Sequence, residues 1–167
     1  MLKSTFGGSG YDIAAAQNEQ AITYQLTENG PSVLKSNFHP NYSDNIFFVY
    51  LNEKKNSRDA IEHYKALPEA NKTGLSEKIS SLTEQFLNCT TLTEFELLIP
   101  IHETLLSRTL QTPKAKQERF PEFPGAIKSL GGWGGDFIMV TGDQAAVFEY
   151  FENKGFKTIF AFQDIVL

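Results

Sequence analysis

Runs of apolar residues, separated by polar and glycine-rich stretches, predict the strands of this chain. Residues 46–51, "IFFVYL", are apolar throughout and rich in β-formers, which is typical of a strand buried on both faces. Two shorter runs flank Asn29-Gly30, a dipeptide that favours a hairpin turn. Further strands are predicted for "AIKSL" at residues 126–130, for "DFIMVTG" at residues 136–142 and for "KTIFAFQDIVL" at residues 157–167.

Apolar residues spaced three and four apart predict the helices. A helix over residues 74–88 would carry Leu75, Ile79, Leu82 and Phe86 on one stripe. A longer helix is expected to begin at Thr91, because Thr91 and Glu94 have the spacing of a capping box. Pro100 should kink or interrupt that helix. The other helices are expected at residues 9–17, at residues 57–67, before Pro68, and at residues 143–155, where Gly155 ends the helix.

The order of these elements predicts an α+β fold with two parts. Residues 44–167 read as strand, several helices, strand, strand, helix, strand, a ferredoxin-like β-α-β-β-α-β plan with extra helices in its first crossover. The segment at residues 111–125 reads as a polar connection broken by prolines. Residues 1–43 hold only a helix and a hairpin, which cannot bury a core by themselves. We therefore expect them to be the remnant of a preceding domain.

Composition narrows the class of protein. The chain has 167 residues, of which 41% are hydrophobic and 21% charged, the balance of a globular domain. Its net charge of −5 and the lack of a basic run argue against nucleic acid or an anionic membrane as a partner. Cys89 is the single cysteine, so no internal disulfide can form. No apolar stretch is long enough to span a bilayer, and the first residues lack the apolar core of a signal peptide, so a cytoplasmic location is expected.

Two glycine-rich turns are the main candidates for chemistry. The turn within "GAIKSLGGWGGDFIMV", residues 125–140, has few side chains. Two readings are open: a nest of backbone amides that binds an anion, or a hairpin turn whose glycines relieve strain. The residues alone leave these alternatives open. The turn "GGSGYD", residues 7–12, opens a helix. Asp12 there is a candidate base or cation partner, although Ser9 and Asp12 also have capping-box spacing.

Other polar residues have simpler structural explanations. His102 lies on the apolar stripe Phe95, Leu98, Ile99, His102, Leu105 and Leu106, where a hydrogen-bonded core histidine is commoner than a catalytic one. Capping by Asn56 or Ser57 accounts for the polar start of the helix that contains Arg58. Lys114, Lys116 and Arg119 form a short mixed-charge linker of the kind that usually stays hydrated.

The two glycine turns together resemble motifs of the GHMP small-molecule kinases, the family of galactokinase, homoserine kinase, mevalonate kinase and phosphomevalonate kinase. The similarity is closest to a bacterial branch with its own "GYDIA" signature, which reads here as residues 10–14. Mevalonate-type kinases carry a Ser-Gly-x-Asp motif at a helix start, matched by Ser9, Gly10 and Asp12. The resemblance implies that Asp12 is the catalytic base or orients the substrate hydroxyl.

The second motif of the family runs Lys-x-[Ser/Thr]-Gly-[Ala/Ser]-Gly-Gly-Gly. Laid on this chain without gaps, it begins at Lys128 and departs from the family at Leu130 and Trp133. The resemblance implies that this loop lines the active-site cleft near the substrate and the nucleotide. The residues implied are Lys128, Ser129, Gly131, Gly132, Trp133, Gly134 and Gly135.

The resemblance also implies ATP and Mg²⁺ as cofactors and a metabolite hydroxyl, mevalonate-like or related, as the phosphoryl acceptor. In the family, the main phosphate-binding loop, Pro-x-x-x-Gly-Leu-Gly-Ser-Ser-Ala, precedes the Ser-Gly-x-Asp motif, and the eight residues before Ser9 do not contain it. We therefore expect this chain to be the C-terminal portion of a kinase, nearly inactive without the N-terminal half. The alternative is a non-catalytic ferredoxin-like module that binds a metabolite or a protein.

Overall fold

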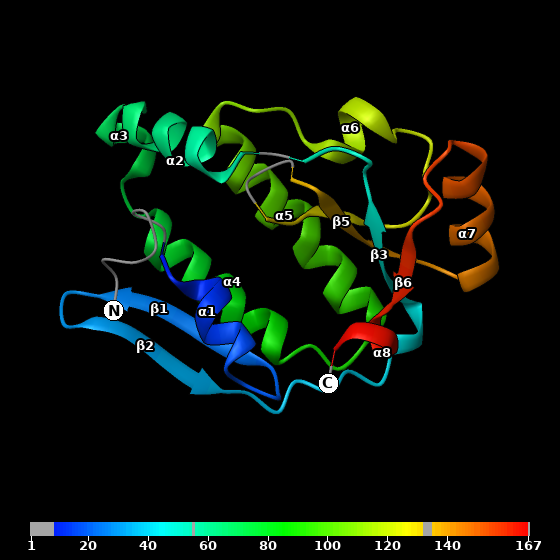
Figure 1. Cartoon of the computed structure of the whole chain (residues 1–167), viewed down its shortest axis with the longest axis horizontal. Helices are drawn as coiled ribbons and strands as arrows, with labels where there is room; N and C mark the ends of the chain where they lie inside the picture. Colours follow the sequence, from blue (N-terminus) through cyan, green and yellow to red (C-terminus); the bar gives the residue numbers. More distant parts are fainter. Residues whose placement is uncertain (1–8, 55, 132–134, 167) are drawn as a thin grey trace. The chain divides into compact units, whose positions relative to one another are not determined.

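The protein is an α+β protein, with an antiparallel hairpin, a four-stranded antiparallel sheet and helices between the strands (Figure 1). The computed structural model describes residues 9–54, 56–131 and 135–166. The chain divides into two compact units, Met1–His39 with Gln163–Leu167 and Pro40–Phe162. Each unit is described by itself below.

The first unit contains the predicted helix and hairpin. Helix α1 covers Tyr11–Ala16, and strands β1, Ile22–Thr27, and β2, Gly30–Lys35, pair antiparallel. The hairpin is confirmed, but its turn residues are 28 and 29, so the turn lies one residue earlier than expected. Gly30 opens β2 opposite Thr27 with a φ of 109°, a backbone conformation that glycine adopts without steric cost.

The second unit is organised around the apolar run predicted as a buried strand. Strand β3, Ile46–Tyr50, lies between β5, Phe137–Thr141, and β6, Ile159–Ala161. Strand β4, Ile127–Ser129, adds to the far side of β5, which gives the order β4-β5-β3-β6 with every neighbouring pair antiparallel. The central position of β3 explains its continuous apolar sequence, because both its faces and both its edges are covered.

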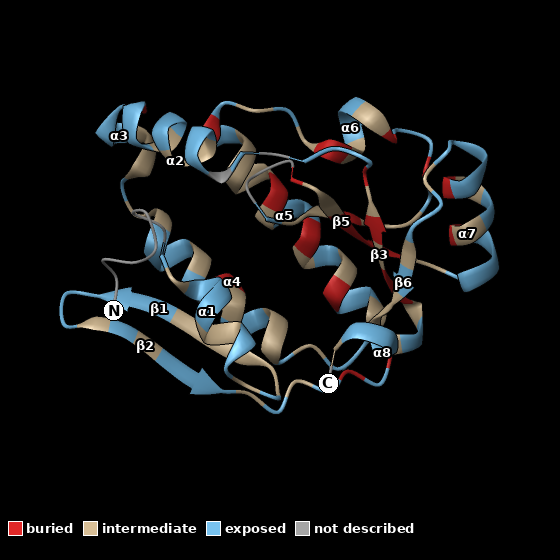
Figure 2. Ribbon diagram, viewed as in Figure 1, coloured by how far each residue is buried: buried red, intermediate tan, exposed pale blue. Residues whose placement is uncertain are grey.

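One large hydrophobic cluster lies on one face of this sheet. Phe47 pairs with Val140 and Val49 with Ile138, so these four side chains share a face. Helix α7, Gln144–Asn153, adds Phe151 to the same core, in which all five side chains are at most 1% exposed. Figure 2 shows the buried residues gathered on the central strands and on the helices next to them.

Most of the predicted helices are confirmed within a residue or two. The confirmed helices are α2 at Ser57–Ala66, α4 at Leu75–Leu87, α5 at Leu92–Leu110 and α7. The connections also contain the short helix α3 at Glu69–Lys72 and a 3-10 turn at Ser43–Asn45. Asn56 caps α2 by accepting from the Arg58 amide. Thr91 and Glu94 form the predicted capping box of α5. Gly155 follows α7 with a φ of 87°, as expected for a residue after a helix end.

Three expectations about the second unit are wrong. Pro100 does not interrupt helix α5, because the neighbouring turns, which include buried Phe95 and Ile99, pack against the protein and offset the hydrogen bond that proline cannot donate. The connection at residues 111–125 contains helix α6, Ala115–Arg119, and supplies the core residues Phe120 and Phe123. The last strand covers only three residues, and the chain then turns into the short helix α8, Phe162–Ile165.

Among the described residues, no helix is both long enough and apolar enough to cross a lipid bilayer. The longest, α5, interrupts its apolar residues with Glu94, Glu96 and Glu103.

Candidate functional site

The Ser9–Asp12 turn begins α1 through an unusual backbone conformation at Gly10. Gly10 is the N-cap residue and is left-handed, with φ 79° and ψ 9°, a region that side chains with a Cβ atom avoid. The expected capping box of Ser9 and Asp12 is wrong, because the N-cap position falls on Gly10 and receives no side-chain cap. Instead, Ser9 Oγ accepts from the Tyr11 amide at 3.2 Å.

The same turn is attached to the hairpin of its unit. The Tyr24 hydroxyl donates to the Ser9 carbonyl, and the rings of Tyr11 and Tyr24 meet edge to face with centroids 5.7 Å apart. Asp12 lies in the first turn of α1 and is exposed. The turn therefore presents the Asp12 carboxylate at the surface, while the hydrogen bond from Tyr24 of β1 holds the backbone of the turn in place.

The glycine loop joins β4 to β5 in the second unit. At its start, the Leu130 amide donates to the Phe137 carbonyl, which closes the ladder between the two strands. Gly131 follows with a φ of 70° and open space where a Cβ would be, and Gly135 at the other end is buried. The predicted loop residues Gly132, Trp133 and Gly134 lie outside the described residues.

Lys128 and Ser129 connect this loop to α5 through Glu103. The Ser129 hydroxyl donates to Glu103 Oε2 at 2.9 Å, and the Lys128 ammonium donates to the Ser129 carbonyl at 3.3 Å. Burial lowers the pKa of Lys128 below its usual value, while the negative charge of Glu103 opposes that shift. The lysine of the second motif is thus a partly desolvated amine whose charge depends on a carboxylate from another element.

We expect Glu103→Gln to lower the pKa of Lys128 further, because the substitution removes the carboxylate that favours the ammonium form. The Lys128 side-chain signals in a heteronuclear NMR titration measure this directly. An unchanged titration midpoint in Glu103→Gln would show that the two groups are not coupled.

The sign of the stability effect follows from the lowered pKa. Between the folded-state pKa of Lys128 and the ordinary lysine value, the unfolded chain binds a proton that the folded protein does not, so stability rises with pH in that window. Lys128→Met should remove this rise, whereas Lys157→Met, at an exposed position, should keep it. Urea unfolding at a series of alkaline pH values makes the comparison.

Asp12 and Lys128 belong to different compact units, and their meeting in one cleft stays a prediction. The other residues considered from the sequence have local partners. The ring of His102 meets the Phe86 ring with centroids 6.3 Å apart, and its Nδ1 lies 3.7 Å from Glu103 Oε1. Arg119 forms an ion pair with Glu53 at 3.4 Å, and the Lys114 and Lys116 amines make hydrogen bonds within the unit, so these linker cations are not simply hydrated.

Sequence reasoning missed Glu96 and Glu103 as functional candidates. Both are on the same side of α5 as Ile99, at a spacing of three and then four residues, and Glu103 is only 6% exposed. The available signal in the sequence was the helical spacing of the two glutamates, which places them on the same face as the apolar residue Ile99. The predicted apolar stripe included Leu98, His102 and Leu105, which the structure leaves only half-buried.

In the part of the chain that the structure describes, no group of three or more histidine, cysteine, aspartate or glutamate side chains is arranged to hold a metal ion. Comparison of the sequence with protein-family models finds no matching family, and no curated protein matches it either. The function therefore has to be argued from the residues and their geometry.

Proposed function

We propose that the chain is the C-terminal portion of an ATP-dependent GHMP-type kinase that transfers the γ-phosphoryl group to the hydroxyl of a small, mevalonate-like metabolite. Both motifs behind the proposal are glycine turns that adjoin regular elements, one before α1 and one between β4 and β5. The similarity to the family supplies the reaction. The chain supplies the Ser-Gly-x-Asp residues at the first turn and Lys128 with several glycines at the second, where Leu130 and Trp133 depart from the family motif.

The observation that carries the proposal is the left-handed backbone of Gly10 in front of an exposed Asp12. It gives the Ser-Gly-x-Asp motif a physical reason, since only glycine enters the helix at this φ without strain. The first turn of the helix then holds the carboxylate at the surface, where a substrate hydroxyl can approach it. A capping aspartate would have its oxygens on backbone amides, but the N-cap of α1 receives no side-chain cap.

The second unit supports the same proposal through its topology. In chain order its strands are β3, β4, β5 and β6, and an antiparallel sheet ordered β4-β5-β3-β6 is what a ferredoxin-like β-α-β-β-α-β plan requires. We assign this unit to the C-terminal domain of the kinase. The α1–β1–β2 unit is assigned to the end of its N-terminal domain.

In the proposed reaction Asp12 accepts, or orients, the proton of the attacking hydroxyl. The loop that begins at Lys128 lines the cleft from the second unit. ATP would supply the phosphoryl group and Mg²⁺ would neutralise charge on it. We assign no step to the ion, since no cluster of three or more histidine, cysteine, aspartate or glutamate side chains occurs among the described residues. The phosphate-binding loop is assigned to the N-terminal half. We also propose a cytoplasmic location, where ATP is available.

Asp12→Asn tests the proposal in a version of the protein extended upstream of Met1. We expect turnover of the phosphorylated alcohol, measured by coupled release of ADP over a panel of small alcohols, to fall about a hundredfold or more, because the amide cannot accept the hydroxyl proton. Asp59→Asn is the matched control, since Asp59 also lies in the first turn of a helix, α2. The 167-residue chain alone should turn over negligibly.

Three results would contradict this assignment. Near-normal turnover in Asp12→Asn would remove Asp12 from the mechanism, and robust turnover by the 167-residue chain would remove the need for a second half. Failure of the extended protein to bind an adenine nucleotide in a calorimetric titration would favour the non-catalytic module instead.

A further inference from the structure

The hairpin of the first unit leaves a row of apolar side chains uncovered. Ile22, Tyr24 and Leu26 of β1 point to one face, and β2 adds Pro31 and Val33, which pair with Leu26 and Tyr24. No residue of α1, β1 or β2, all of which the structure describes, is buried, and Leu26 and Val33 are 56% and 38% exposed. A hairpin with such a face is marginal in water until more strands complete it.

The backbone of β1 also has an unused edge. The Ser36 amide donates to the Ala21 carbonyl at 2.8 Å, so these two residues form a hydrogen-bonded pair of the ladder. Hydrogen-bonded and non-hydrogen-bonded pairs alternate along an antiparallel ladder, so the N–H and C=O groups of Ile22, Tyr24 and Leu26 point away from β2. Among the described residues, β1 pairs with β2 alone. The outer edge of β1 is therefore open to another strand.

The two edges of the hairpin differ in how they resist such pairing. On β2 the outward backbone groups belong to Pro31, Val33 and Lys35. Proline has no N–H to donate, and a lysine on an edge strand disfavours the approach of a further strand. Residues 22–27 contain neither a proline nor a charge. At six residues, β1 is also longer than β4 and β6, the edge strands of the other sheet, which cover three residues each.

We propose that two copies of this chain associate through their β1 strands, antiparallel and about a two-fold axis at Tyr24. Tyr24 then lies opposite the partner's Tyr24, and Ile22 lies opposite the partner's Leu26. All of these residues have their N–H and C=O groups on the open edge, so each facing pair exchanges two hydrogen bonds. The product is a four-stranded sheet in the order β2-β1-β1-β2, which is a closed, isologous assembly.

The sequence of β1 is complementary to its own copy. Ile22 and Leu26 are each two positions from Tyr24, so the two-fold axis brings aliphatic side chains of similar size face to face. The strand carries no charge, and Glu28, the first charged residue beyond its end, would lie across from the partner's Gln20, which is neutral. The pairing therefore brings no like charges together, which would be destabilising.

The same pairing completes the apolar face. The ring of Tyr11 in α1 meets the Tyr24 ring, so α1 lies on the face of the hairpin that carries the apolar side chains. A two-fold axis perpendicular to the sheet keeps both copies of α1 on that face. Two helices over four strands can cover Leu26 and its neighbours, which one helix over two strands leaves exposed.

Sedimentation velocity on the 167-residue chain measures the association. We expect a species of twice the 18.7 kDa mass of one chain, whose share grows as the concentration rises from low micromolar to several hundred micromolar. Leu26→Pro should weaken association about tenfold or more, because it removes an outward N–H and its ring occupies the space of the incoming strand. Val33→Pro is the matched control, since Val33 has the same outward orientation on the other edge.

Two further measurements locate the interface without a proline. In the unmodified chain, NMR hydrogen exchange of the Ile22, Tyr24 and Leu26 amides should slow as the concentration rises, whereas that of the Val33 amide should not. Tyr24→Cys in a Cys89→Ser background should form an intermolecular disulfide with diamide as the oxidant. The Cα atoms of a hydrogen-bonded pair lie about 5.5 Å apart, which a disulfide can bridge. Val33→Cys in the same background should not cross-link.

A chain that stays monomeric at several hundred micromolar overturns the proposal, and that is the result expected if the edge accepts only a strand of a different protein. Equal weakening by Leu26→Pro and Val33→Pro, or equal cross-linking by Tyr24→Cys and Val33→Cys, also overturns it, because the interface would then lie elsewhere. None of these readouts involves ATP, a substrate or Asp12, so their outcome is independent of the kinase proposal.

Discussion

Replacing Phe151 by alanine is expected to lower the free energy of unfolding by about 3–5 kcal/mol. Phe151 is fully buried, and its ring meets those of Phe120 and Phe123 at centroid distances of 5.2 and 5.0 Å. Together with Val147, it brings α7 into the core shared by the sheet and the α6 segment. Truncation would remove those contacts and leave a cavity that the rigid strands β3 and β5 cannot fill.

Urea unfolding followed by far-UV circular dichroism measures the effect, and two matched variants show whether burial is its cause. Phe160→Ala makes the same change at a position on β6 that is 37% exposed, so it should cost much less. Phe151→Leu keeps most of the volume and should lose less than about 1.5 kcal/mol. Equal losses for Phe151→Ala and Phe160→Ala would contradict the position of the core derived from the structure.

The same core explains why much of the fold could be predicted from the sequence. The run at residues 46–51 reads as a strand because it fills the middle of the sheet, where every side chain meets apolar neighbours. Thr91 with Glu94 and Asn56 mark helix starts because capping depends on residues within one turn, which any sequence window contains. Signals of this kind depend on residues close in the sequence, so tertiary contacts do not change them.

Features that depend on distant residues could not be predicted. The connection at residues 111–125 looks polar, yet Phe120 and Phe123 enter the core because α7 lies next to it. Pro100 does not end α5, because buried residues on both sides of it outweigh one lost hydrogen bond. Glu103 reads as a solvent-exposed glutamate until β4 brings Ser129 and Lys128 to it.

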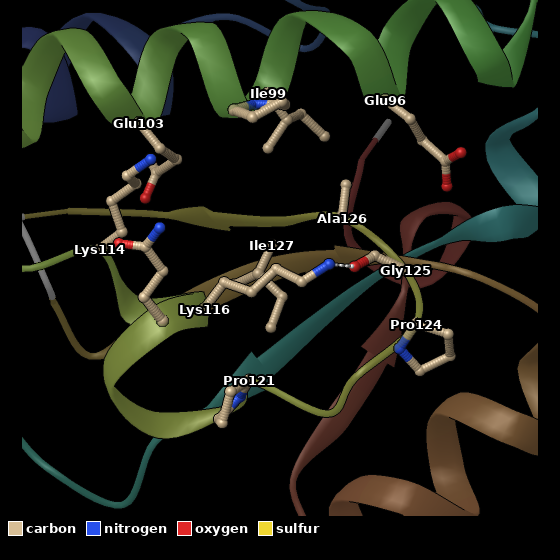
Figure 3. A pocket seen from close by; sticks show the side chains of 12 residues that line it. Glu96, Ile99, Glu103, Lys114, Lys116, Pro121, Pro124, Gly125, Ala126 and Ile127 are labelled. Atoms are coloured by element: carbon tan, nitrogen blue, oxygen red, sulfur yellow. Dashed lines mark hydrogen bonds between the residues drawn. The ribbon is translucent and has the colours of Figure 1, made fainter.

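The candidate kinase site was predictable only in part for a related reason. Motif matching located Asp12 and the loop that starts at Lys128, and the structure gives Gly10 the left-handed backbone that suits a glycine. Motifs alone did not indicate the Lys128–Glu103 coupling, because it joins residues 25 positions apart through burial. The cavity lined by Glu96, Glu103, Lys114 and Lys116 (Figure 3) was missed altogether, since α5, the α6 segment and β4 together form it.

Gly125→Ala is the second substitution with a large expected effect. A Cβ atom on Gly125 would lie 1.8 Å from the Thr141 carbonyl oxygen and 2.8 Å from the Phe123 ring, so the backbone itself would have to move. The next residue is tied to the same strand, because the Ala126 amide donates to Thr141 Oγ1 and the Ala126 carbonyl accepts from the Thr141 amide. We expect a loss of about 3 kcal/mol or more, the upper range for overpacking, measured by urea unfolding.

Gly155→Ala separates this clash from the general cost of replacing a glycine. Gly155 has a φ of 87° and no atom within 4 Å of the added Cβ, so the variant should lose only about 1 kcal/mol of backbone strain. If Gly125→Ala were as mild as Gly155→Ala, the segment that leads into β4 would not lie as close to Thr141 as the structure has it.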